Sequence, residues 1–118
     1  MHIVRFADAP NYVAPGHHEM AMFRLHGREA GPSRDVWLGV SVIAPGGGTT
    51  LSSSPQEKMY VVLDGELDIS NGEASATLGK WDSCRIAGGE SQQLTNRTSV
   101  AVAVLLVMPL SAEERAAA

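Results

Sequence analysis

The segment GGGTTLSSSPQEKMYVVLDG, residues 46–65, carries the pattern that most constrains the architecture. Three glycines open it, three serines follow at 52–54, and a strand-like run over 58–63 leads to Gly65. Glycine and proline recur at short intervals through the rest of the chain, and the segments between them are brief and often alternate in polarity. This pattern is typical of many antiparallel strands, so the sequence predicts an almost all-β domain.

Nine segments are expected to form strands. They cover residues 2–6, 20–26, 36–44, 58–63, 66–70, 74–78, 83–86, 91–95 and 100–108. Asp64 and Gly65 supply the positive φ angles of a tight two-residue turn, which predicts a hairpin over 58–70. Leu67 and Ile69 alternate with polar residues in its second strand, so one face of that strand should contact the core.

Composition limits the classes of partner. The 118 residues fit one domain, and a hydrophobic fraction of 44% is enough for a continuous core. The net charge is −4 and the nine Lys and Arg residues are scattered, which argues against nucleic-acid binding. No signal-peptide core and no apolar stretch of roughly 20 residues is present, so we expect a cytoplasmic protein without membrane contact.

The spacing within residues 46–65 resembles the first motif of the cupin superfamily, G-x5-H-x-H-x3 or 4-E-x6-G. Three glycines open the motif and Gly65 closes it at the required distance. Ser52 and Ser54 stand where the two histidines would be, and Lys58 stands where the glutamate would be. All three metal-ligand positions of this motif are therefore changed.

The second cupin motif, G-x5-P-x-G-x2-H-x3-N, is matched in part. Gly89 and Asn96 match, an alanine replaces the proline, and Gly79 opens the motif two residues early. Gln92 replaces the histidine, so the fourth metal ligand is also missing. The resemblance covers roughly residues 37–108.

The resemblance implies an all-β fold, the double-stranded β-helix or jelly-roll barrel of a cupin. Residues 1–110 are expected to form this single domain, with N-terminal strands over 1–35 and the barrel core over 36–110. Residues 111–118 should form a short C-terminal tail, and Ser111 is a suitable cap for one or two frayed helical turns.

The altered motifs predict a site without metal or other cofactor. Cupins with intact motifs bind iron, manganese, nickel or zinc through imidazole and carboxylate groups. Serine and glutamine are poor neutral donors, and a protonated lysine repels a divalent ion. A weaker alternative is a metal-dependent oxygenase whose non-standard ligands come from the segment of His17 and His18, although neighbouring residues on a strand point to opposite faces.

The resemblance places Lys58 inside the barrel, and strand alternation puts Tyr60 on the same face. Burial would lower the pKa of Lys58, which suits a general base or a nucleophile, while Tyr60 can exchange a proton or bind an oxyanion. The pair is the candidate catalytic site. Ser52, Ser54 and Gln92 are the expected substrate-binding residues beside it.

Arg85 and His26 are further candidates for substrate binding. Arg85 has the side chain for bidentate contact with a carboxylate. If its strand is regular, His26 shares a face with Met20, Met22 and Arg24. Tyr12 and Trp37 are expected to pack, with a cavity-lining role for one of them as the alternative.

These features favour a metal-independent cupin that acts on a small oxygenated organic molecule by isomerase, lyase or decarboxylase chemistry. The alternative is a non-catalytic cupin that binds a small ligand or a partner protein, in which Lys58 simply pairs with an acid such as Glu57 or Asp35. The strand expected over 100–108 is apolar on both faces and must be covered twice, so we expect a homodimer.

Overall fold

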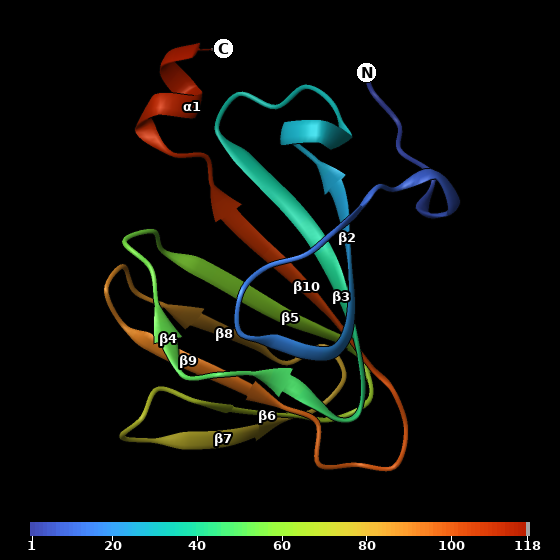
Figure 1. Ribbon diagram of the computed structural model, residues 1–118, viewed down its shortest axis with the longest axis vertical. Helices are drawn as coiled ribbons and strands as arrows, with labels where there is room; N and C mark the ends of the chain where they lie inside the picture. The colour runs from blue at the N-terminus through green and yellow to red at the C-terminus, as the bar shows by residue number, and fades with distance from the viewer. Residues whose placement is uncertain (118) are drawn as a thin grey trace.

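The computed structural model describes residues 1–117, and most of their regular structure is β-strand (Figure 1). The strands are β1 (Asn11–Tyr12), β2 (His17–His26), β3 (Val36–Thr49), β4 (Ser52–Ser53), β5 (Lys58–Asp64), β6 (Leu67–Ser70), β7 (Ser75–Leu78), β8 (Ser83–Ile86), β9 (Ser91–Thr95) and β10 (Val102–Pro109). Two 3-10 turns, η1 (Phe6–Asp8) and η2 (Arg28–Ala30), and one helix, α1 (Ala112–Ala117), complete the described chain. The all-β prediction is confirmed, but the strand expected over 2–6 is wrong: residues 2–5 form no regular structure and Phe6 begins η1.

The strands form a nearly closed antiparallel barrel (Figure 1). Their hydrogen-bonded order is β7-β6-β9-β3-β10-β5-β8, while β2 also pairs with β3, β1 with β2, and β4 with β9. The long strand β3 connects the two layers: most of it pairs with β2 and β10, whereas Gly48 near its end lies opposite Thr95 of β9. This is the jelly-roll arrangement that the sequence predicts.

The predicted hairpin over 58–70 is wrong. β5 pairs with β10 and β8, whereas β6 pairs with β7 and β9. Gly65 does have the expected positive φ of 85°, but the chain uses this turn to cross from one layer to the other. A turn residue fixes only the local change of direction, and burial of the strand faces selects the pairing partners. The hairpin that forms instead joins β6 to β7.

The core is apolar and lies between the two layers. Its fully buried side chains are Ile43, Val62, Leu67, Val102 and Val104, each at most 1% exposed. Each contributes about 1.5–3 kcal/mol of hydrophobic stabilisation. The alternation predicted in β6 is confirmed, because both of its apolar side chains are in this core.

Asn96, which matches the closing residue of the second motif, is a buried structural residue with no exposed surface. Its Nδ2 donates to the carbonyl oxygens of Ile43 at 2.9 Å and Val100 at 2.8 Å. Its Oδ1 accepts bonds from the backbone N–H and the hydroxyl of Thr98, at 2.9 and 2.7 Å. One side chain therefore fixes the loop before β10 against β3.

The outer face of β3, β10 and β5 is apolar. Leu105 of β10 lies opposite Val40 of β3 and Val61 of β5, and Val107 lies opposite Met59. Most of these side chains are only partly covered, and Met59 is 45% exposed. The second apolar face predicted for the C-terminal strand is thus present on the barrel's outside. None of the described helices is long and apolar enough to cross a membrane.

Candidate functional site

A cavity of about 310 Å³ is lined by side chains from β2, β3, β5, β9 and β10 and from the segments beside them. Five residues predicted for the site contribute to its wall: Lys58, Tyr60, Ser52, Ser54 and Gln92. The structure therefore brings together both candidate catalytic residues and three candidate substrate-binding residues. The volume is at the lower end of the range of about 300–1,000 Å³ that is usual for small-molecule sites.

Strand pairing explains this convergence. Lys58 and Tyr60 are two residues apart on β5, so both point to the inner face, where they are 7% and 5% exposed. Ser52 lies directly opposite Gln92 in the antiparallel pair of β4 and β9. Ser54 follows β4 and donates from its hydroxyl to the carbonyl oxygen of Gln56 at 3.2 Å.

Lys58 has an amide partner and no acidic partner in the described chain. The Gln92 amide donates to the main-chain oxygen of Ser52 at 2.8 Å and accepts from Lys58 Nζ at 3.2 Å, in the orientation that satisfies both neighbours. No ion pair within residues 1–117 involves Lys58, and Glu57 pairs with Arg85 instead, at 3.0 Å. Desolvation by burial lowers the pKa of Lys58.

Tyr60 is suited to donate a hydrogen bond. Burial raises the pKa of this phenol well above its usual range, with smaller contributions from Tyr12 and Cys84. Tyr60 therefore keeps its proton over the pH range in which the lowered pKa of Lys58 lets that amine become neutral. The two side chains have separate capacities: a base on Lys58 and a hydrogen-bond donor on Tyr60.

The four positions that hold a metal in intact cupin motifs do not fit a divalent ion here. They offer two hydroxyls, one amide and one amine, and the amide oxygen is taken by Lys58. Within residues 1–117 no three His, Cys, Asp or Glu side chains are grouped as a metal site. His17 lines the cavity and lies 2.8 Å from the Pro15 oxygen through Nδ1, whereas His18 is not part of the wall.

Arg85 and His26 do not line this cavity. Arg85 is exposed on the outer face of β8, where it pairs with Glu57. His26 is displaced by a β-bulge: Arg24 lies opposite Gly39 but His26 lies opposite Leu38, so β2 has one extra residue between them. One inserted residue turns the following side chain to the other face, which separates His26 from Arg24.

A second part of the wall is formed by Arg24 with Tyr12 and Trp37. Both aromatic residues line the cavity, where the sequence offered this role for one of them as an alternative, and Arg24 was not predicted as a site residue. The guanidinium carbon of Arg24 lies 3.8 Å from the Tyr12 ring centre and 4.3 Å from the Trp37 ring centre, which is cation–π distance. Arg24 Nε also donates to Glu29 at 3.1 Å. Gly39 permits this packing, because a Cβ there would lie 3.2 Å from the Tyr12 hydroxyl. The available signal was a charged residue in the apolar stripe of Met20 and Met22.

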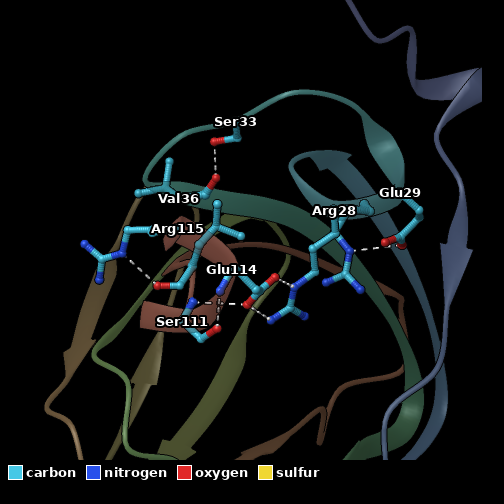
Figure 2. Close-up of polar contacts among 9 residues, drawn as sticks. Arg28, Glu29, Ser33, Val36, Ser111, Glu114 and Arg115 are labelled. Carbon is cyan, nitrogen blue, oxygen red and sulfur yellow. Dashed lines mark hydrogen bonds and ion pairs between the residues drawn. The ribbon is translucent and has the colours of Figure 1, made fainter. Parts of the chain in front are cut away.

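The cavity wall is cationic although the chain is acidic. The permanently charged Arg24 and Arg28 line it together with Lys58, while no Asp or Glu of the described residues does. Arg28 is held at the rim by α1, where its guanidinium makes a bidentate pair with Glu114 at 2.8 and 3.1 Å (Figure 2). The Arg28 hydrogen bonds are the main reason that the pKa of Glu114 falls to about 2.

The fold and this cavity define a class. No protein-family model matches the sequence. The structure aligns with an RmlC-like cupin from Shewanella frigidimarina at a TM-score of 0.78, with 10% identity over 97% of this chain and 95% of that one. The polyketide cyclase RemF from Streptomyces resistomycificus aligns at 0.81, with 19% identity over 98% and 90% of the two chains. The molecule therefore has the cupin fold.

The sequence also has a relative of higher identity. It is 46% identical over 98 residues to the protein named Beta-D-galactosidase Rv1717 of Mycobacterium tuberculosis. The match covers 83% of this chain and 84% of the mycobacterial protein. The chain therefore belongs to the same family as that protein.

Proposed function

We propose that this cupin is a metal-independent enzyme that isomerises a small sugar acid in the barrel cavity. The observation that carries the proposal is the buried amine of Lys58, which replaces a metal ligand and has no acidic partner in the described chain. Burial lowers the pKa of Lys58 because the charged form is poorly solvated, so this amine becomes an available base at lower pH than an exposed lysine does.

The chemistry requires only side chains of the cavity. Neutral Lys58 removes the proton from the carbon next to a carbonyl group and becomes an ammonium, while the electron pair moves onto the carbonyl oxygen. Tyr60 donates a hydrogen bond to that oxygen. Lys58 then returns the proton to the former carbonyl carbon, while the proton of the C2 hydroxyl moves to the C1 oxygen through the Tyr60 hydroxyl. The C2–oxygen bond becomes the new carbonyl, which completes the isomerisation of an aldose to a ketose. General-base catalysis of this kind contributes about 10²–10⁴-fold in rate.

The name of the mycobacterial relative suggests a ligand with the configuration of galactose. Glycoside hydrolysis ordinarily uses two carboxyl groups on either side of the scissile bond. No Asp or Glu of the described residues lines this cavity, whereas its cations favour an anion. We therefore propose a galactose-like sugar acid as the ligand and isomerisation as the reaction.

The test uses D-galacturonate and D-galactose, which differ by a carboxylate, dissolved in D₂O. We expect the protein to accelerate loss of the proton NMR signal at C2, faster in galacturonate than in galactose. The rate should rise with pH and level off below 10.5, the ordinary pKa of lysine, because burial lowers the pKa of Lys58 and only the neutral amine is active.

Two other outcomes would contradict isomerisation. Binding of galacturonate without exchange would support the non-catalytic alternative, a cupin that holds a small ligand. Release of nitrophenol from a nitrophenyl β-galactoside, without exchange at C2, would show that the activity named for the relative is shared. In that case the acid and base would have to lie outside this cavity.

We also propose that the chain forms a homodimer through the apolar outer face of β3, β10 and β5. Leu105 is at the centre of this face, with apolar partners on both sides. Light scattering should give a mass of twice 12.5 kDa, and Leu105→Glu should halve it by placing a charge in the interface. Val100→Glu, at a position 60% exposed in a loop, is the control and should remain dimeric. A monomeric wild-type protein would refute the proposal.

A further inference from the structure

Two buried donors beside the cavity have no partner among residues 1–117. They are Nη1 of Arg24 and Nε1 of Trp37. The two residues are only 6% and 4% exposed, and both contribute to the cavity wall. Buried N–H groups are almost always paired, and leaving a charged donor unpaired is costly. The combination therefore indicates that acceptor oxygens belong at this end of the cavity.

The geometry holds the Arg24 guanidinium in one orientation. The Tyr12 and Trp37 rings are nearly perpendicular, at 87°, and the guanidinium lies in the corner that they form. Glu29 accepts from Nε on one edge, which leaves the Nη groups for another acceptor. Because the side chain is already fixed, an anion that binds it loses little additional side-chain entropy.

We propose that Arg24 and the Trp37 indole N–H bind the carboxylate of the ligand. The inference rests on the proposed function and deepens it, since it names the group that selects an acid over a neutral sugar. A carboxylate matches this place because its two oxygens accept from the guanidinium fork and from the indole together. Glu29 does not fill it, because it reaches only Nε.

Arg24 and Trp37 together form the carboxylate anchor. Strand register shows that this anchor lies in line with Tyr60 at the reacting end of the cavity. Arg24 lies opposite Gly39, Gly39 opposite Leu106, and Leu106 opposite Tyr60, so the anchor and Tyr60 share one row across four strands. A ligand bound at both ends has its carboxylate and its carbonyl at opposite ends of the molecule. Open-chain galacturonate has this arrangement, with the acid at C6 and the aldehyde at C1.

Entry of the carboxylate requires a small movement, because both unpaired donors are shielded from solvent. Tyr12 belongs to the two-residue strand β1, and the next residue, Val13, is 93% exposed. Short strands with exposed neighbours open at low free energy. The segment that includes Tyr12 is therefore the part of the wall expected to shift when the ligand binds.

The experiment is an NMR titration of ¹⁵N-labelled protein with sodium galacturonate, and separately with galactose. The chain has two tryptophans, so two indole N–H signals are expected, and the 69% exposed Trp81 is the internal control. Galacturonate should shift the Trp37 signal and leave Trp81 unchanged, with affinity about tenfold or more above that of galactose. An unmoved Trp37 signal at millimolar galacturonate, or equal affinity for both sugars, would overturn the proposal.

Variants separate the anchor from a general effect of charge. Arg24→Met should abolish the preference for galacturonate, whereas Arg85→Met removes an exposed arginine outside the cavity and should keep it. A preference that survives Arg24→Met would also overturn the anchor. If the proposed reaction fails but the anchor is correct, galacturonate binding still depends on Arg24 and exchange at C2 is absent. This result differs from failure of the anchor, in which the preference for galacturonate does not depend on Arg24.

Discussion

Lys58→Met is expected to abolish exchange at C2 of galacturonate and, at the same time, to raise the thermal unfolding midpoint. Methionine has a similar length but provides no base, so exchange should fall to the rate without protein. Lys58 has no acidic partner among the described residues, so replacing this buried cation by an apolar side chain removes its desolvation cost and should stabilise the fold by about 1–2 kcal/mol at neutral pH. Enzyme assays by NMR and thermal unfolding followed by circular dichroism measure the two effects.

The pH dependence of the stabilisation follows from the direction of the pKa shift. The pKa of Lys58 is lower in the folded protein than in the unfolded chain, so the unfolded state binds more protons between the lowered pKa and 10.5. The stability of the wild-type protein is therefore reduced by Lys58 at neutral pH and recovers as the pH rises through the lowered pKa. The advantage of Lys58→Met should shrink accordingly in alkaline solution.

Lys80 provides the matched control, because it is the only other lysine and is exposed. Lys80→Met should retain exchange activity and the wild-type unfolding midpoint. If Lys58→Met lowers the midpoint instead, then Lys58 is a stabilising structural residue through its bond with Gln92. If exchange persists in Lys58→Met, another group is the base.

Asn96→Ala is expected to destabilise the fold strongly. The change removes four hydrogen bonds at a fully buried position and leaves the carbonyl groups of Ile43 and Val100 without this donor. We expect a loss of about 3–5 kcal/mol, since each unpaired buried group costs about 1–3 kcal/mol. Chemical denaturation with a two-state fit measures this value.

Asn71→Ala is the control for Asn96→Ala. Asn71 makes three hydrogen bonds of similar length, to Glu73, Ala74 and Glu90, but it lies in the turn between β6 and β7. Water can replace these partners there, so the loss should be below about 1 kcal/mol. Equal losses at the two positions would mean that burial is not the reason for the importance of Asn96.

Several features of the site follow from local sequence rules. The spacing from Gly46 to Gly65 indicates the barrel, and it also identifies Ser52, Ser54 and Lys58 as the residues at the altered ligand positions. Alternation then places Tyr60 beside Lys58, because side chains two apart on a strand share a face. In the structure these side chains line one cavity.

Other features depend on contacts between distant segments. The turn at Gly65 gives no information on partners, and the hairpin predicted from it is wrong because β5 and β6 bury their faces against different strands. The bulge after Arg24 turns the His26 side chain to the opposite face of β2. Simple alternation of side chains along a strand does not predict such a bulge. The Arg24 anchor requires Tyr12, Trp37 and Glu29 to lie around one guanidinium group. Only the packing of the folded chain determines which polar side chains are buried away from water and which of them have a hydrogen-bond partner.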